Sequence, residues 1–198
     1  ASDALQSLAL CSPVCKQAIA KLEAVRKMAD VAVAAMNARP DSVEVQLTGC
    51  SALVDLAARA VLGVQAVVNA GGVAAVVAAM RLHTADAELQ SRGCAALQNL
   101  AVGSPVRKQA IVDRGGLAAV VAAMGLHTAD PELQCCGCGA LRQLTIGDAA
   151  PKQAIVDGSG VVAVVAAMRL HTADAKLQSR GCAALQNLAH GSPVRKQA

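Results

Sequence analysis

The chain has 198 residues, of which 55% are apolar, and it contains no Phe, Tyr or Trp. The apolar fraction excludes a disordered chain, and the absence of aromatic rings excludes base-stacking platforms for single-stranded nucleic acid and cages for methylated ammonium groups. The net charge of +4 comes from 18 basic residues that are spread along the chain, so the basic cluster typical of a nucleic-acid domain is missing and we expect no nucleic-acid partner.

The first part of the chain predicts helices without a clear break between them. Residues 1–11 match the end of a later long helix, with Leu5 and Leu8 at its apolar positions. From Lys16 to Met36 the chain lacks the Gly-Gly pair that separates helices further on. We therefore expect the first two helices of this region to run together.

Further along, the pattern of caps and breaks predicts three helices in each segment. Ser104 and Pro105 supply an N-cap and a proline at the first helical position, and Gly115-Gly116 ends this short helix. A second helix follows, with apolar residues at the i, i+3, i+4 and i+7 positions. Asp130 caps a third, longer helix, which begins at Pro131 and runs to about residue 146.

This segment recurs with a period of 44 residues. The period is visible in Met36, Met80, Met124 and Met168, and again in His83, His127 and His171. Blocks 81–110 and 169–198 differ at two of thirty positions, which hold Glu88 and Val102 in the first block and Lys176 and His190 in the second. A fixed period between 20 and 50 residues is typical of stacked repeat proteins.

We expect a single repeat array over residues 1–198. The complete units are predicted at residues 12–59, 60–103, 104–147 and 148–191, with partial units at 1–11 and 192–198. Neither end carries the polar capping repeat that covers an exposed core. We therefore expect the array to continue beyond both ends.

The stretch GCAALQNLAVGSPVRKQAIVDRGG at residues 93–116 resembles the armadillo repeat, which has three helices per unit and a glycine break before the second. The resemblance covers essentially the whole chain, and the two-helix HEAT repeat is the neighbouring alternative. It implies an all-α fold, a right-handed superhelical α-solenoid of stacked three-helix armadillo-like repeats. In that family the third helices line a concave groove, which typically holds an extended peptide.

The resemblance also implies candidate binding residues. Peptide-binding members use an Asn on the third helix to contact the main chain of the ligand, and this chain has Asn99 and Asn187 at that place. Gln143 and Asp55 replace the Asn in two other units. Members that carry nuclear-import cargo have a Trp four residues earlier, where this chain has Ser51, Ala95, Gly139 and Ala183, so such cargo is not the expected ligand. The small side chains at positions 95, 139 and 183 are expected to let a bulky ligand group or a partner helix approach closely.

Helical spacing extends this set into a polar strip. Residues 4, 7 and 11 positions before the Asn lie on nearly the same side of the helix. The charged and amide members of the strip are Asp55, Glu88, Arg92, Asn99, Glu132, Gln143, Lys176, Arg180 and Asn187. Two alternatives stay open: each Asn binds only the neighbouring repeat, and the arginines are ordinary solvated side chains.

Other chemistry is not expected. Cys135, Cys136 and Cys138 point in different directions on one helix, and successive His residues lie a whole repeat apart, so neither set predicts a metal site. Residues 60–80 form an uncharged run of near-transmembrane length, but its central polar and glycine residues argue against a membrane span. We expect no signal peptide, no cofactor and no catalytic activity, since no nucleophile–base arrangement stands out.

The sequence therefore predicts a non-catalytic interaction scaffold that binds a peptide or a segment of a protein partner. The alternatives are a structural array in a large cytoskeletal or ciliary assembly and a regulatory arm of a multidomain enzyme such as a large kinase. Eight cysteines in a helical, apolar chain favour reduced thiols and a cytoplasmic location. Because Glu88 and Lys176 reverse the charge at equivalent positions, we predict that their units prefer ligands of opposite charge.

Overall fold

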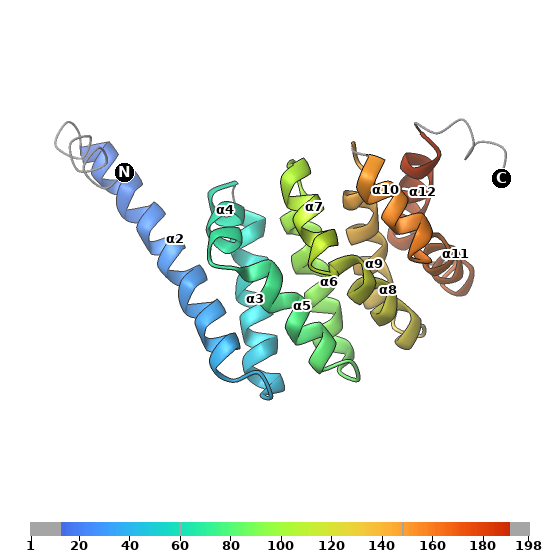
Figure 1. The fold of residues 1–198 in the computed structure, drawn as a ribbon, viewed down its shortest axis with the longest axis horizontal. Coiled ribbons are helices and arrows are strands. Elements are labelled where there is room, and N and C mark those ends of the chain that lie inside the picture. Colours follow the sequence, from blue (N-terminus) through green and yellow to red (C-terminus); the bar gives the residue numbers. More distant parts are fainter. Residues whose placement is uncertain (1–12, 60, 148, 191–198) are drawn as a thin grey trace.

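A computed structural model of the chain describes residues 13–59, 61–147 and 149–190, and in these residues it contains 11 α-helices and no strand. The helices stack side by side along one axis (Figure 1). In chain order they are α2 (Pro13–Ala38), α3 (Val43–Arg59), α4 (Val61–Asn69), α5 (Gly72–Leu82), α6 (Ala87–Ala101), α7 (Pro105–Asp113), α8 (Gly116–Leu126), α9 (Pro131–Leu144), α10 (Ala149–Asp157), α11 (Gly160–Leu170) and α12 (Ala175–Ala189). The prediction that the first two helices run together is confirmed, because α2 is one helix of 26 residues.

The turns between helices follow from short-range chemistry. Before the second helix of two units, Gly71 and Gly115 have φ angles of 83° and 76°, a left-handed conformation that glycine adopts without a steric penalty. Before the third helix, the side chain of Asp130 accepts a hydrogen bond from the Leu133 backbone N–H at 3.0 Å. Ser104 caps α7 in the same way, so both N-caps predicted from the sequence are confirmed.

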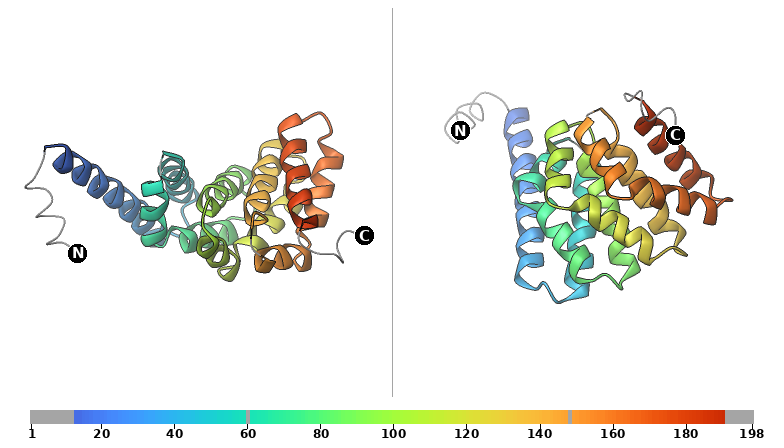
Figure 2. Two further views of the ribbon diagram at one scale, coloured as in Figure 1. Left: turned by 90° about the horizontal axis from the view of Figure 1, so that it is seen from above. Right: turned by 45° about the vertical axis from the view of Figure 1, so that its right-hand side comes forward.

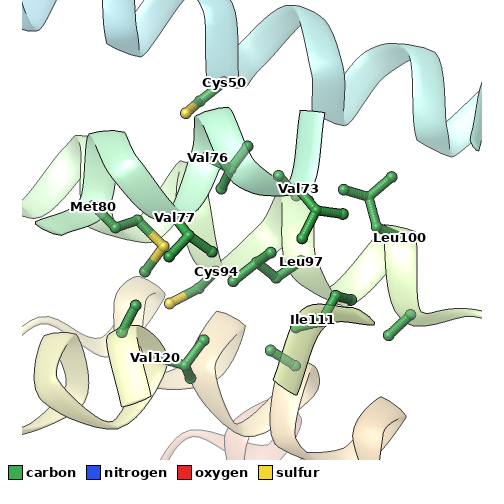
Figure 3. Close-up of a cluster of buried hydrophobic side chains, with 14 of the residues drawn as sticks. Cys50, Val73, Val76, Val77, Met80, Cys94, Leu97, Leu100, Ile111 and Val120 are labelled. Carbon is green, nitrogen blue, oxygen red and sulfur yellow. The ribbon is translucent and has the colours of Figure 1, made fainter. Parts of the chain in front are cut away.

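The core runs continuously along the stack. Each long helix (α3, α6, α9 and α12) packs on the next one, and so does each second helix (α2, α5, α8 and α11). Figure 3 shows side chains from successive units meeting in one cluster, among them Met80, Cys94, Leu97 and Val120, all less than 2% exposed. A unit therefore buries its apolar face largely against its neighbours, as expected for a repeat protein.

A glycine in each long helix admits the methionine of the helix before it. A Cβ atom at Gly93 would lie 2.5 Å from Cγ of Met80, and one at Gly137 would lie 2.6 Å from Cγ of Met124. The same pairing joins Gly49 with Met36. Because any larger residue would overlap the methionine, the glycine sets how closely the second and third helices of a unit approach.

Candidate functional site

The polar strip lies on the row of long helices, which we call the third-helix row (α3, α6, α9 and α12). Consecutive members of this row are packed against each other. The row forms one layer of the stack, and the shorter helices form the other, as the views of Figure 1 and Figure 2 show. The side chains of Asp55, Glu88, Glu132 and Lys176 are exposed, and those of Arg92, Asn99, Gln143, Arg180 and Asn187 are half-buried. The residues predicted for the strip are thus carried on four adjacent helices and remain accessible to solvent.

The two asparagines already bind the preceding helix of the row. Nδ2 of Asn99 lies 3.5 Å from the Val54 carbonyl oxygen, and Nδ2 of Asn187 donates to Oγ1 of Thr145 at 3.2 Å. A side-chain amide has two N–H donors and an acceptor oxygen. Each of these bonds uses one donor, which leaves the second N–H and Oδ1 for a ligand main chain. The structural role and the binding role of these residues are therefore compatible.

Arg180 also connects two units. Its guanidinium donates to the Cys135 carbonyl oxygen at 3.0 Å and lies 3.4 Å from the sulfur of the same residue. The Arg180 side chain is half-buried, so part of it still faces solvent. The arginine is therefore held in one place on the surface of the row, and its charge is less free to move than that of Lys176.

The small residue at position 139 does not leave open space. From the sequence, Gly139 is expected to let a bulky ligand group or a partner helix approach closely. That expectation is wrong, because a Cβ at Gly139 would lie 2.1 Å from Oε1 of Gln98 and 3.0 Å from a terminal nitrogen of Arg180. The glycine is buried beneath side chains of the units on either side, so it serves contact between units.

A ladder of hydrogen bonds joins successive units on the loops before the long helices. Nε2 of His127 lies 2.7 Å from the Thr84 carbonyl oxygen, and His171 makes the equivalent contact with Thr128 at the same distance. The ring N–H is the donor in each case, because a carbonyl can only accept. The predicted position of the histidines at the end of the second helix is confirmed. The bond to the preceding unit could not be derived from one unit alone.

A glutamine in each unit also stabilises the loop before the long helix, through hydrogen bonds within the same unit. Nε2 of Gln90 donates to the carbonyl oxygens of Met80 and His83, at 2.7 and 2.9 Å. These two carbonyls lie at the end of α5, where helix geometry leaves them without an intrahelical donor. The sequence held a signal for this role, because Gln46, Gln90, Gln134 and Gln178 recur every 44 residues.

The buried cysteines are better explained as core residues than as reactive thiols. Cys94 and Cys138 are fully buried, and burial raises the pKa of Cys138 to about 12. A thiol with so high a pKa is not a thiolate nucleophile at neutral pH. Among the described residues, no group of three or more His, Cys, Asp or Glu side chains is placed to hold a metal ion.

One further property concerns membranes. In the part of the chain that the structure describes, no single helix is both long enough and apolar enough to span a bilayer. Three consecutive helix pairs reach the required length and composition together, but each pair is bent by 66° to 70° at its break.

Comparison with known proteins identifies the fold. The sequence matches no protein-family profile, and no curated protein matches it. Among solved structures, a designed armadillo repeat protein superposes with a TM-score of 0.75 at 21% identity, over 98% of this chain and 76% of the designed one. This chain has an armadillo-like repeat fold.

Two more solved structures are similar to this armadillo-like chain. A designed armadillo repeat protein in complex with the peptide (KR)4 gives a TM-score of 0.74 at 19% identity, over 98% of this chain and 83% of that one. An engineered protein from the Northeast Structural Genomics Consortium gives a TM-score of 0.74 at 30% identity over 98% of this chain. This chain spans 44% of the length of that engineered protein.

Proposed function

We propose that this chain is a non-catalytic interaction scaffold whose third-helix row binds an extended segment of a protein partner. The observation that carries the proposal is the polar strip, a line of accessible amide and charged side chains on helices that pack in serial order. Neighbouring helices lie roughly 8–10 Å apart, so four of them offer a track of about 40 Å. About a dozen residues of an extended chain fit on that length.

Amide side chains suit such a ligand. An extended peptide that leaves water presents unpaired N–H and C=O groups, and each one that stays unsatisfied costs about 1–3 kcal/mol. The free N–H and Oδ1 of Asn99 and Asn187 offer a donor and an acceptor for these groups. A main-chain contact of this kind fixes the position of the ligand without selecting its side chains.

Charges along the row supply the selectivity. Exposed Glu44 and Asp55 place acidic side chains on α3. On α6 the charges of Glu88 and Arg92 balance, whereas Lys176 and Arg180 make α12 basic. We infer that the ligand has basic side chains opposite the acidic residues of α3 and opposite Glu88, and acidic side chains opposite α12. The designed armadillo repeat protein in complex with the peptide (KR)4 supports a basic segment as a ligand for a fold of this kind.

The remaining parts of the proposal concern context. We propose that the protein works in a reducing, cytoplasmic environment, because the described cysteines are free thiols and three of them are fully buried, namely Cys50, Cys94 and Cys138. We further propose that the chain acts without a cofactor and without contact with nucleic acid.

The test compares peptide binding by the wild-type chain and by a variant with Asn99→Ala and Asn187→Ala. Binding to an array of 12-residue peptides with different charge patterns identifies a ligand, and fluorescence anisotropy then measures its dissociation constant. We expect the double variant to bind at least about tenfold more weakly, because two sets of main-chain hydrogen bonds are lost.

Asn69→Ala provides the matched control. Asn69 is an exposed asparagine on α4, in the other layer of the stack, and it accepts a hydrogen bond from Gln65 only four residues away. Its replacement leaves the third-helix row intact and should not change the affinity. Equal affinity of the double variant and the wild type for every ligand found would contradict the proposal and favour a purely structural array.

A further inference from the structure

Two side chains from different units meet over one glycine of the third-helix row. A Cβ atom at Gly139 of α9 would lie 2.1 Å from Oε1 of Gln98 and 3.0 Å from Nη1 of Arg180. Gln98 belongs to α6 and Arg180 belongs to α12, and both helices pack against α9. We call Gln98 and Arg180, together with the buried Gly139 beneath them, the clamp.

The clamp depends on a unit that differs from its two neighbours. Helices α6 and α12 differ at one position only, which holds Glu88 in α6 and Lys176 in α12. Of these two similar helices, α6 places its glutamine on the following helix and α12 places its arginine on the preceding one. The described long helices other than α9 have Ser or Ala at the position of Gly139. Because an added Cβ would overlap both side chains, α9 is the described long helix on which they can meet.

One nitrogen of the Arg180 guanidinium holds the side chain in place. Nη1 donates to the Cys135 carbonyl oxygen at 3.0 Å and lies 3.4 Å from Sγ of the same residue. In the described part of the chain, no carboxylate pairs with Arg180, and no acceptor binds its Nε–H or Nη2 N–H groups. Nε–H and one Nη2 N–H form a fork that matches the two oxygens of a carboxylate. The arginine is therefore fixed in position with its carboxylate-binding edge available.

Gln98 adds a second donor beside the arginine. Its side chain is half-buried, and its amide has no hydrogen-bond partner among the described residues. A side-chain amide has two N–H donors and an acceptor oxygen, and its terminal torsion has two similar minima half a rotation apart. After such a rotation Nε2 faces the clamp, where it can donate to an oxygen that Arg180 also binds.

One acidic side chain stands near the clamp. Glu132 is exposed and lies one helical turn before Cys136 on α9. Burial is the main cause that raises the pKa of Cys136; Arg180 opposes this rise and Glu132 adds to it, so both charges act at the same thiol. Glu132 forms no ion pair with Arg180 in the described structure, and solvent screens exposed charges. For a carboxylate bound directly to the guanidinium, the attraction of Arg180 therefore outweighs the repulsion of Glu132.

We propose that the clamp binds the side-chain carboxylate of an acidic residue in the partner segment, a proposal that rests on the proposed function of the third-helix row. The carboxylate accepts hydrogen bonds from Nε–H and Nη2–H of Arg180 and from Nε2 of Gln98. Asn99 and Asn187, on the two flanking helices, hold the main chain of the segment on either side of this residue. The clamp thus fixes the register of the segment, which main-chain contacts alone leave open.

A double-mutant cycle between Arg180 and the ligand tests the clamp. Twelve-residue peptides are screened against the complete chain, with acetylated and amidated ends so that side chains supply the only carboxylates. In the tightest binder each Glu is changed to Gln and each Asp to Asn in turn. Fluorescence anisotropy then measures the dissociation constants with the wild type and with Arg180→Gln.

We expect one acidic residue of the peptide to stand out. Its neutral replacement should weaken binding to the wild type at least about tenfold, and binding to Arg180→Gln by less than about twofold. A tightest binder without any acidic residue, or equal losses with the two proteins, overturns the clamp.

Arg92→Gln is the matched control. Arg92 occupies the position in α6 that Arg180 occupies in α12, and it is also half-buried. The helix before it, α3, has Ser51 in place of Gly139, so no clamp forms there. With Arg92→Gln, neutralising the same peptide residue should still cost about tenfold in affinity, as with the wild type. Loss of the coupling in both arginine variants would indicate a general effect of positive charge and would count against the clamp.

Gly139→Ala displaces the clamp without removing its charge. The atoms nearest to the added Cβ are the ends of two flexible side chains, and alanine is the better helix former. We expect this variant to fold with a melting temperature close to that of the wild type and to bind the acidic peptide at least about threefold more weakly. Unchanged affinity of Gly139→Ala would refute the proposed geometry.

The outcomes separate the clamp from the wider binding surface. If no peptide binds the wild type, the proposed function of the third-helix row fails and the clamp fails with it. If the variant with Asn99→Ala and Asn187→Ala binds more weakly but no acidic residue couples to Arg180, the row binds peptides and only the clamp is overturned.

Discussion

Replacing Gly93 by Ala tests whether the glycine sets the distance between the second and third helices. The new Cβ would lie 2.5 Å from Cγ and 2.6 Å from Sδ of Met80, whose side chain is 1% exposed. Non-bonded carbon atoms prefer about 3.5–4.0 Å, so the methionine or the helix has to shift. Overpacking of this kind costs about 1–3 kcal/mol.

The higher helix propensity of alanine offsets part of this loss of stability. Ala is favoured over Gly in a helix by about 1 kcal/mol. We therefore expect Gly93→Ala to lower the free energy of unfolding by up to about 2 kcal/mol. For a chain of this size the melting temperature should fall by up to roughly 8 °C. Urea and thermal unfolding, followed by circular dichroism, measure both quantities.

Gly125→Ala is the control that isolates the effect of helix propensity on stability. Gly125 lies in α8 and is exposed, and a Cβ there meets nothing within 4 Å. This variant should be more stable than the wild type by about 0.5–1 kcal/mol. In a Met80→Ala background, Gly93→Ala should lose its penalty. If Gly93→Ala proves as stable as Gly125→Ala, or remains destabilising without the methionine, the reasoning is refuted.

Three further predictions address the ladder, the core thiols and the charge of the row. His127→Ala removes a hydrogen bond between units and should lower the free energy of unfolding in urea by about 1 kcal/mol. Replacement of the exposed His190 by Ala should lower it by less than about 0.5 kcal/mol. Equal effects of the two changes would contradict a stabilising role of the histidine ladder. Burial raises the pKa of Cys138 to about 12. The unfolded chain therefore loses this thiol proton at a lower pH than the folded chain does. The free energy of unfolding should fall as the pH rises above about 8.5, by at most about 1.4 kcal/mol per pH unit. Cys138→Ala should reduce the slope of unfolding free energy against pH, and Cys182→Ala should leave it unchanged. Lys176→Glu should shift peptide-array binding from acidic towards basic ligands by roughly threefold to tenfold, and an unchanged profile would refute the charge preference.

The sequence predicted the fold because its signals are local and repeated. N-caps such as Asp130, glycine breaks such as Gly115-Gly116 and apolar positions at helical spacing each act within a few residues. Their recurrence every 44 residues then indicates that one packing solution serves all units. The long first helix could be predicted as well, since the glycine pair is missing between Lys16 and Met36.

The candidate site was predictable as a set of positions but not as a set of contacts. Helical spacing placed Asn187 and Arg180 on the third-helix row. Only the packed structure showed that one donates to Thr145 and the other to Cys135, both in the preceding unit. The expectation of open space at Gly139 was wrong for the same reason. The side chains that fill this space come from the units on either side.

The sequence alone determined the repeat, the helices and their caps, which depend on residues within one turn of each other. The tertiary structure decided which surfaces are covered. Residues 89–101 and 177–189 are identical, yet Cys94 is fully buried and Cys182 is exposed. The physical reason is that burial in a stack depends on the neighbouring layer, and no residue carries that information in its own local sequence.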